Sequence, residues 1–400
     1  MNLSSSTSSG QQVEMPDDWL PAPWTRGQRP GIVDVMANVA AHRQGRDVVL
    51  LLDGLGSLLL EEHRAHAPTL RALARDTRTI RTVLPSTTAV ALASLMTGES
   101  PLRHGICGYE GFDPDQRRVF SHLAWDDRLD PRVWMPLPNI AQRTDRRCIQ
   151  VGPRNFETSG LTRALYHGWG FMGHAAHSGR VDTVLSAVRA AGPDGLVYVH
   201  LRDIDHAGHV GGTRSESWRT ALEDVDADIG ALLRRLPRGT RVSMLADHGM
   251  VDTDPQHIID LAKTPLADDI DLIAGEPRAG VIVLKTGVDP DQAVTRWQDV
   301  LGQFAHVMTS ECALAAGLFG PPEITVSESI GSGSVGSGAT ASDATARRMR
   351  PRFGDLIVLA RQRAIVADSR HHSQQAMNLA GVHGSATPEE CLIPLVHVLV

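Results

Sequence analysis

The chain has 400 residues, of which 42% are hydrophobic, and a formal net charge of -7 at pH 7. This length and apolar content allow a sizeable core, and we expect a large α/β domain with an inserted subdomain. The negative charge argues against a nucleic-acid polymer or an anionic membrane as the main partner.

The chain begins with a Ser-, Gln- and Pro-rich segment, and we expect residues 1–30 to form a flexible arm. This segment lacks the basic start and apolar run of a secretory signal. No later stretch approaches the roughly 20 apolar residues that cross a bilayer. Four scattered cysteines without CxxC spacing indicate neither a disulfide framework nor a Cys zinc site. We therefore expect a cytoplasmic protein.

Strand and helix patterns alternate from residue 47 onward. We predict strands at 47–52, 79–84, 196–201, 241–245 and 392–400. We predict helices from the turn at 53–56 through Arg75, over 89–95, and over 215–236. This alternation predicts an α/β fold with a mostly parallel sheet covered by helices on both faces. Sites in such sheets lie beyond the carboxyl ends of the strands.

The pattern changes between residues 263 and 375, where we expect a small α+β cap. Its predicted elements are strands at 280–285 and 355–359 and a helix near 290–303. A Gly/Ser-rich stretch at 327–343 is typical of a flexible loop. The catalytic α/β domain is then predicted to comprise residues 31–262 and 376–400.

Four segments place potential metal ligands at or near the ends of predicted strands. They contain Asp53, Asp205 with His209, Asp247 with His248, and His383. Asp and His are the residues that bind zinc where Cys is absent. Glycine stands beside most of them and allows a ligand to approach closely. Together these segments predict a metal centre.

Thr88 stands immediately before the helix predicted at 89–95. A hydroxyl at a helix N-terminus is surrounded by free backbone N–H groups and the positive end of the helix dipole. Both stabilise an alkoxide and a bound phosphate. Thr88 could equally be a simple N-cap, and this segment alone leaves both interpretations open.

These motifs together resemble the alkaline phosphatase superfamily, and within it the type I phosphodiesterase/nucleotide pyrophosphatase family. The resemblance is carried in order by VVLLLDGLG at 48–56, PSTTAVALASLMTGESPLRHGI at 85–106, DIDHAGHVGG at 203–212, ADHGM at 246–250 and GVHGS at 381–385. It covers most of residues 47–260 and again 380–400. It implies an alkaline phosphatase-like fold and a hydrolase of phosphate esters.

The resemblance also implies two zinc ions, although manganese or iron could occupy the same ligands. The ligands implied for one zinc are Asp53, Thr88, Asp247 and His248, and those for the other are Asp205, His209 and His383. The family's Asp-x-x-x-His spacing selects Asp205 and His209, with Asp203 and His206 as the competing register.

Thr88 is implied as the nucleophile because it stands three residues after Pro85 and ten before Gly98, as the nucleophile does in the family. Thr87 remains an alternative. The nucleophile would attack phosphorus in line and form a phosphothreonine intermediate. The second metal would stabilise the leaving oxygen and then activate water.

The family usually carries an Asn shortly after the His-Gly-Ile segment, whereas here Ile106 is followed by Cys107, Gly108 and Tyr109. Another group must therefore contact the phosphate, and the candidates are Tyr109, Arg154 and Asn155. Arginine suits this role because of its planar fork of donors.

We expect a small phosphorylated substrate, such as a nucleotide, and a phosphodiesterase or nucleotide pyrophosphatase activity. A phosphomonoesterase or phosphonate hydrolase on the same scaffold remains an alternative. A non-catalytic, zinc-stabilised binding module is an alternative of a different class.

Overall fold

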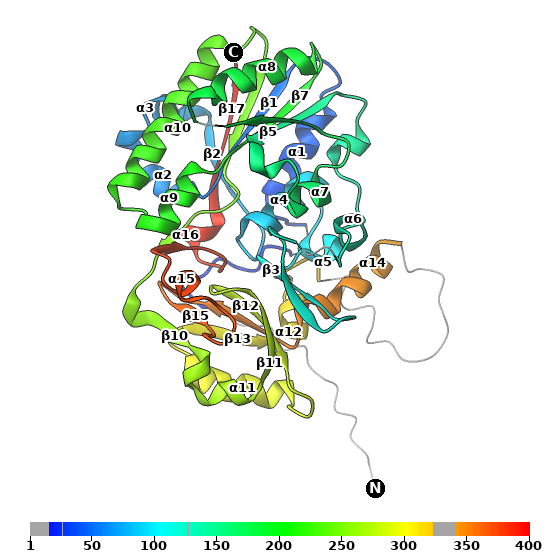
Figure 1. Cartoon of the computed structure of the whole chain (residues 1–400), viewed down its shortest axis with the longest axis vertical. Helices are drawn as coiled ribbons and strands as arrows, with labels where there is room; N and C mark the ends of the chain where they lie inside the picture. Colours follow the sequence, from blue (N-terminus) through cyan, green and yellow to red (C-terminus); the bar gives the residue numbers. More distant parts are fainter. Residues whose placement is uncertain (1–15, 26, 126–127, 176, 323–340) are drawn as a thin grey trace.

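The computed structural model describes residues 16–25, 27–125, 128–175, 177–322 and 341–400. Figure 1 shows a larger part, which contains the C-terminus, and a smaller part built on a second sheet. No helix in these described ranges is both long and apolar enough to cross a membrane.

The larger part is built on a seven-stranded sheet with the order β2-β17-β8-β1-β7-β5-β6. Its strands are β1 (Asp47–Leu52), β2 (Thr77–Arg81), β5 (Cys148–Pro153), β6 (Gly170–His174), β7 (Leu196–Leu201), β8 (Arg241–Leu245) and β17 (Leu392–Leu399). β17 runs antiparallel to both of its neighbours, β8 and β2, and the remaining pairs are parallel. The predicted mostly parallel α/β sheet is confirmed.

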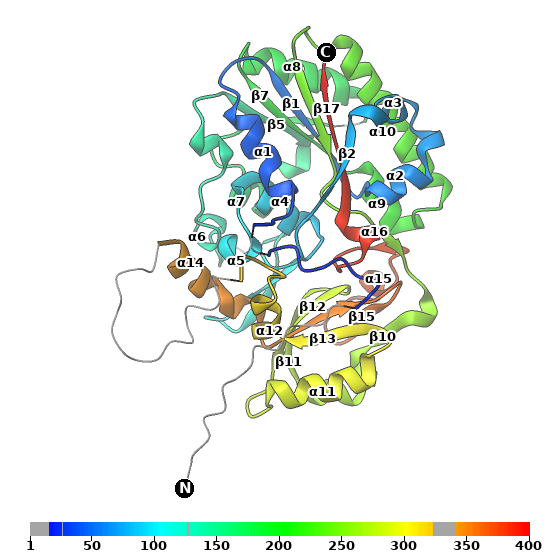
Figure 2. The ribbon, with the colours of Figure 1, turned by 180° about the vertical axis from the view of Figure 1, so that it is seen from behind.

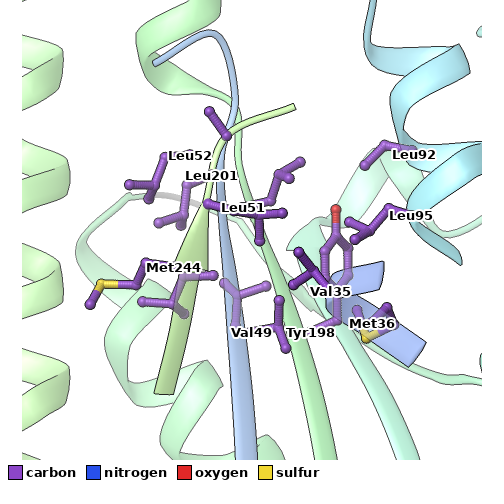
Figure 3. Close-up of a cluster of buried hydrophobic side chains, with 14 of the residues drawn as sticks. Val35, Met36, Val49, Leu51, Leu52, Leu92, Leu95, Tyr198, Leu201 and Met244 are labelled. Atoms are coloured by element: carbon purple, nitrogen blue, oxygen red, sulfur yellow. The ribbon is translucent and has the colours of Figure 1, made fainter. Parts of the chain in front are cut away.

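Helices cover both faces of this sheet (Figures 1 and 2). The helices of this part are α1 (Ile32–Ala41), α2 (Ser57–Glu62), α3 (Pro68–Ala72), α4 (Thr88–Thr97), α5 (Pro101–His104), α6 (Pro131–Trp134), α7 (Gly160–Leu165), α8 (Arg180–Ala191), α9 (Asp203–Gly211), α10 (Glu216–Arg235) and α16 (Pro388–Cys391). Figure 3 shows Met36 of α1 and Leu95 of α4 beside Tyr198 of β7, in one buried cluster. Both faces of the central strands are thus withdrawn from water, as their continuous apolar sequences require.

The single helix predicted up to Arg75 is wrong, because α2 and α3 are separate helices. Pro68 occupies the first turn of α3. Proline has no backbone N–H and disfavours a helical conformation at the residue before it, so it starts a new helix rather than continuing the old one.

The smaller part is built on a six-stranded antiparallel sheet with the order β13-β14-β12-β11-β3-β4. Its strands are β3 (Glu110–Asp113), β4 (Arg118–Ser121), β11 (Ile270–Glu276), β12 (Ala279–Leu284), β13 (Ala305–Thr309) and β14 (Leu356–Ala360). α11 (Pro290–Leu301) packs on it through Trp297, and α12 (Ser310–Ala315) and α14 (Ala341–Met349) lie nearby (Figure 1). The hairpin of β3 and β4 was not predicted to join this sheet, yet Glu110 pairs with Gly275 of β11.

Two short strand pairs and one helix complete the elements near the junction of the two parts. They are β9 (Val251–Asp252) with β16 (Gly381–Val382), β10 (Ile258–Asp260) with β15 (Ile365–Ala367), and α15 (Gln374–Met377).

The expected flexible arm and loop lie partly outside the described residues, which exclude 1–15 and 323–340. The described part of the arm is packed rather than flexible, because Trp19 is 6% and Trp24 is 5% exposed. The backbone N–H of Trp24 also donates to the carbonyl oxygen of Gly317. At the other end of the expected loop, residues 341–343 belong to α14.

Candidate metal centre and catalytic cavity

The polar segments singled out in the sequence meet at the carboxyl ends of three adjacent strands. Asp53 follows β1, Asp247 follows β8, and Asp205 lies in the first turn of α9, just after β7. β1 pairs with both β7 and β8, so the three strand ends are neighbours. The parallel order of the sheet therefore brings together carboxylates that are far apart in sequence.

Asp53, Asp247 and His248 form the first group of potential ligands, with ligand atoms within 4.8 Å of one another. The His248 Nε2 atom lies 3.6 Å from Asp53 Oδ1 and 3.5 Å from Asp247 Oδ2. The Thr88 hydroxyl oxygen lies 3.0 Å from the same Nε2 and 3.5 Å from Asp53 Oδ1. The Thr88 hydroxyl therefore lies beside this group.

The second group is built on Asp205 and His383, whose ligand atoms lie within 4.8 Å of each other and of one on His248, and His209 lies beside Asp205. The Nε2 atoms of His209 and His383 lie 3.4 Å and 3.7 Å from Asp205 Oδ1. The rings of His383 and His248 stack with centroids 3.6 Å apart, so the two groups adjoin. In the competing register, Asp203 is instead bonded to Arg180, which supports the pairing of Asp205 with His209.

The three histidines present the ring nitrogen that a metal needs. The Nδ1 atoms of His209, His248 and His383 lie 2.8, 2.9 and 3.0 Å from backbone carbonyl oxygens. Because a carbonyl oxygen only accepts hydrogen bonds, each Nδ1 carries the proton and each Nε2 keeps its lone pair. Those Nε2 atoms are the ones that lie near the carboxylates.

The carboxylates also fit divalent cations. Asp205 Oδ1 and Asp247 Oδ2 are buried and have no hydrogen-bond partner among the described residues, which is costly for an ionised group. Burial raises the pKa of Asp53 well above its usual value, and the nearby Asp247 and Asp205 carboxylates raise it further. Three carboxylates so close together require compensating positive charge. The donor set of three Asp and three His residues, all oxygen and imidazole, suits zinc, manganese or iron.

Gly54 allows two of these segments to approach each other. Its φ angle is +77°, and a Cβ atom there would lie 2.9 Å from the Cβ atom of Asp205. Its backbone N–H donates to Asp247 Oδ1 at 3.2 Å. A side chain at position 54 would therefore push the β1 turn away from α9.

His200 was missed by the sequence analysis. It lies in β7, is buried, and places its Nε2 atom 2.6 Å from Asp53 Oδ2. The signal available in the sequence was a histidine within an otherwise apolar strand. In the structure, His200 is in register with Leu51 of β1. Its partner could not be identified until the neighbouring strand was known.

Glu276 was also missed, because it comes from β11 of the second sheet. It is 6% exposed, its Oε1 atom has no hydrogen-bond partner in the described part of the chain, and burial raises its pKa to about 8. Glu276 interacts with Thr87, which is about 190 residues away in the sequence. No local sequence pattern predicts this interaction.

A cavity of about 670 Å³ opens over Thr88 and the potential ligands, and residues of both parts line it. Tyr109, one of the three proposed substrate contacts, lies in this lining. Arg154 and Asn155 do not, because they are exposed and line a separate pocket with Asp203. Of the three predicted substrate contacts, the structure thus leaves Tyr109 as the candidate.

The cavity lining is mainly apolar and carries few cations. Its apolar side chains include Leu92, Leu123, Phe156, Leu161, Tyr166 and Val210. Among the described residues of the lining, Arg202 is the single Lys or Arg, and Asp53, Glu110, Asp205 and Glu276 are the carboxylates.

Comparisons with known proteins agree with this geometry. The family model described as type I phosphodiesterase / nucleotide pyrophosphatase matches residues 48–386. A curated relative, an uncharacterised pyrophosphatase/phosphodiesterase of Schizosaccharomyces pombe, is 25% identical over 230 residues, which are 54% of this chain and 47% of the relative. The chain thus aligns with about half the length of that protein.

Two solved structures share the fold. One is murine ectonucleotide pyrophosphatase/phosphodiesterase 5 in an inactive form in complex with AMP, with a TM-score of 0.63, 17% identity, and 88% of each chain covered. The other is phosphonoacetate hydrolase from Sinorhizobium meliloti 1021 in complex with phosphonoformate, with a TM-score of 0.61, 16% identity, and 89% of this chain and 90% of that chain covered. Identities this low support a shared fold only. The substrate must therefore be argued from the residues of the site.

Proposed function

Since the chain belongs to the type I phosphodiesterase/nucleotide pyrophosphatase family, we propose that it hydrolyses phosphate esters through a phosphothreonine formed on Thr88, with two zinc ions at the metal centre. One observation carries this proposal: the Thr88 hydroxyl oxygen stands at the first residue of α4 and lies 3.0 Å from the Nε2 atom of His248. The proposed nucleophile thus lies beside the proposed metal ligands and also beside a helix N-terminus.

The start of α4 supports a catalytic role for Thr88 rather than a capping role. Thr87 is the N-cap residue, and it makes no side-chain capping hydrogen bond. The first N–H groups of a helix have no acceptor within the helix. They are available to hold the non-bridging oxygens of a phosphoryl group next to Thr88, as helix N-termini do in other phosphate sites.

The reaction proceeds in two displacements at phosphorus. The Thr88 hydroxyl gives its proton to solvent and its oxygen bonds to phosphorus, while the bond to the ester oxygen breaks and that oxygen leaves with the electron pair and takes up a proton from solvent. Water then gives a proton to solvent and bonds to phosphorus, the bond from phosphorus to the Thr88 oxygen breaks, and the Thr88 oxygen is protonated again as the phosphate product is released. When bound, two zinc ions supply the Lewis acidity that lowers the pKa of a coordinated hydroxyl or water and the charge that stabilises a leaving oxygen.

The protein's own residues hold this arrangement in place. His200 holds one oxygen of Asp53, and the other oxygen remains toward Thr88 and His248. The carbonyl groups that accept from Nδ1 of the three histidine ligands fix their rings. Such outer contacts normally tune metal affinity and ligand orientation.

We further propose that the substrate is a small phosphate diester or pyrophosphate, such as a nucleotide derivative. The apolar lining accommodates a large uncharged portion of a substrate. A diester carries one negative charge at phosphorus, whereas a monoester or a phosphonocarboxylate carries more, and beyond the proposed metal centre Arg202 is the one Lys or Arg among the described lining residues. The AMP complex of the murine relative is compatible with a nucleotide-like substrate.

The proposal is tested by assaying the zinc-loaded protein against bis-p-nitrophenyl phosphate, p-nitrophenyl phosphate, phosphonoacetate and a dinucleotide, with Thr88→Ala as control. We expect diester and dinucleotide turnover to dominate and to disappear in Thr88→Ala. Faster monoester or phosphonate turnover would overturn the substrate assignment but would leave the proposed metal centre and nucleophile in place. If the wild-type protein binds zinc but turns over none of the four compounds, the binding-module alternative takes its place.

A further inference from the structure

A third group of potential ligands lies in the same cavity, outside the two-metal centre. It consists of Glu110, His371 and His372, whose ligand atoms lie within 4.8 Å of one another. Neither the nucleophile nor the six proposed metal ligands belong to it. We propose that these three residues bind a third divalent cation of the zinc class in the cavity wall.

Two rigid segments hold the three side chains in place. Glu110 begins β3 and pairs with Ser121 of β4 and Gly275 of β11. His371 and His372 lie in a turn between β15 and α15, in which both backbone N–H groups donate to the carbonyl oxygen of Asp368, at 3.0 and 2.7 Å. Ligands carried by ordered elements lose little freedom on binding a metal, which favours a site.

The buried Asp368 strengthens this turn. Its side chain is 1% exposed and accepts hydrogen bonds from the backbone N–H and the Nε atom of Arg370, both at 2.9 Å. The turn is also tied to β10, because Asp260 accepts from the backbone N–H of Ser369 at 3.0 Å. The two histidines therefore project from an anchored turn.

The geometry needs only a small adjustment to admit a cation. The His371 Nε2 atom lies 2.8 Å from Glu110 Oε2. Ligand atoms about 2.0 Å from a tetrahedral zinc lie about 3.3 Å apart, so this pair must separate by about half an ångström. His371 is exposed and Glu110 is half-buried, which leaves both side chains room to move.

The second histidine must change its tautomer to present a lone pair at Nε2. The backbone N–H of Asp368 donates to the His372 Nδ1 atom at 3.1 Å, and the carbonyl oxygen of Asp368 lies 3.3 Å from the same Nδ1. Binding through Nε2 therefore gives up the bond from the N–H and makes Nδ1 a donor to this carbonyl, the arrangement that metal-bound histidines normally have. The rings of His371 and His372 are perpendicular, with centroids 5.0 Å apart.

The chemistry of the donor set also suits zinc. Two histidines and one glutamate form a known zinc-binding set that leaves one coordination position open. A cation bound by Glu110 would add positive charge to a lining in which Arg202 is the single described Lys or Arg. This inference does not depend on the proposed hydrolysis, because it concerns the number of bound ions and not turnover.

Zinc is counted per chain by mass spectrometry after the protein is loaded with zinc and the unbound metal removed. We expect three zinc ions in the wild-type protein and two in each of Glu110→Gln and His371→Ala. The matched control is His66→Ala, since His66 pairs with Glu223 at 2.7 Å but has no third ligand nearby in any described cluster. This control is expected to keep three ions.

Two results would overturn the proposal: two ions in the wild-type protein, or three ions that both variants retain. A second measurement covers variants that fail to fold. Anomalous diffraction at the zinc edge, on crystals of the wild-type protein, is expected to give a peak between Glu110 and His371. A peak confined to the Asp53 and Asp205 groups would contradict the third site. The Thr88→Ala assay tests hydrolysis separately.

Discussion

The Nε2 atom of His200 lies 2.6 Å from Oδ2 of Asp53, so a buried histidine holds one oxygen of a proposed zinc ligand. Burial lowers the pKa of His200, so its ring is neutral and donates from Nε2 to the carboxylate. Asp53 is thereby fixed with its other oxygen near Thr88 and His248.

Replacing His200 by Ala is expected to weaken zinc binding by roughly 10- to 100-fold, the usual cost of losing an outer contact to a metal ligand. Competition with a chromogenic chelator measures this affinity. His397→Ala is the matched control, because His397 is partly exposed and bonds Ser243 on β8, next to β17. An unchanged zinc affinity in His200→Ala would show that Asp53 does not need this partner.

Thr88→Ala and Thr87→Ala separate the two candidate nucleophiles. We expect kcat to fall by about 10⁴-fold or more in Thr88→Ala, because the first displacement loses its attacking oxygen. Thr87→Ala is expected to stay within about tenfold of the wild type, since Thr87 makes no side-chain capping hydrogen bond, whereas the Thr88 hydroxyl oxygen is the one that lies 3.0 Å from His248 Nε2. Steady-state kinetics on bis-p-nitrophenyl phosphate decide between them, and the opposite ranking would assign the reaction to Thr87.

Glu276 is expected to make the protein less stable as pH rises. Burial raises its pKa to about 8 in the folded protein, whereas a glutamate in an unfolded chain titrates near 4.3. Between these values the folded state keeps a proton that the unfolded state has lost, so the free energy of unfolding falls with increasing pH.

Glu276→Gln removes this titration and keeps the side-chain volume. We expect the variant to be more stable than the wild type by about 2–4 kcal/mol at pH 8 and to lose most of this advantage at pH 4.5. Urea unfolding at the two pH values measures the difference. The exposed Glu223→Gln is the control, with an expected change below about 0.5 kcal/mol at either pH; an advantage of Glu276→Gln that is independent of pH would contradict the explanation.

Asp47 anchors the amino end of β1 and is expected to have the opposite pH dependence. Burial by itself would raise its pKa, but hydrogen bonds from Arg241, Arg146 and His42 lower it overall. A lowered folded pKa gives stability that is present above the unfolded value near 3.9 and is lost as pH falls below it.

Asp47→Asn leaves the buried Arg146 without its counter-ion and is expected to destabilise the protein by about 3 kcal/mol at pH 7. The difference from the wild type should shrink as pH falls toward 3, because the unfolded wild-type chain then takes up a proton that the folded Asp47 carboxylate resists. Denaturant unfolding at both pH values tests this. Asp182→Asn, in an exposed pair with Arg235, is expected to have little effect.

Much of the fold follows from local sequence, and the set of proposed metal ligands was implied by the family resemblance. The apolar runs of β1, β7 and β8 predict buried parallel strands, because such strands need no polar face. In a parallel sheet the carboxyl ends lie at one edge, so Asp53 and Asp247 were expected at the same edge, whereas the pairing that makes β1 and β8 neighbours came from the structure. The four-residue spacing of Asp205 and His209 places both on one face of α9.

Only the tertiary structure decided which outer groups complete the site. His200 contacts Asp53, and Glu276 contacts Thr87. In the third group, Glu110 contacts His371, which is 261 residues away in the sequence. Local periodicity reports which face of an element is buried, but it does not report what lies against that face. Such contacts depend on strand order and on the docking of two sheets, which long-range packing determines.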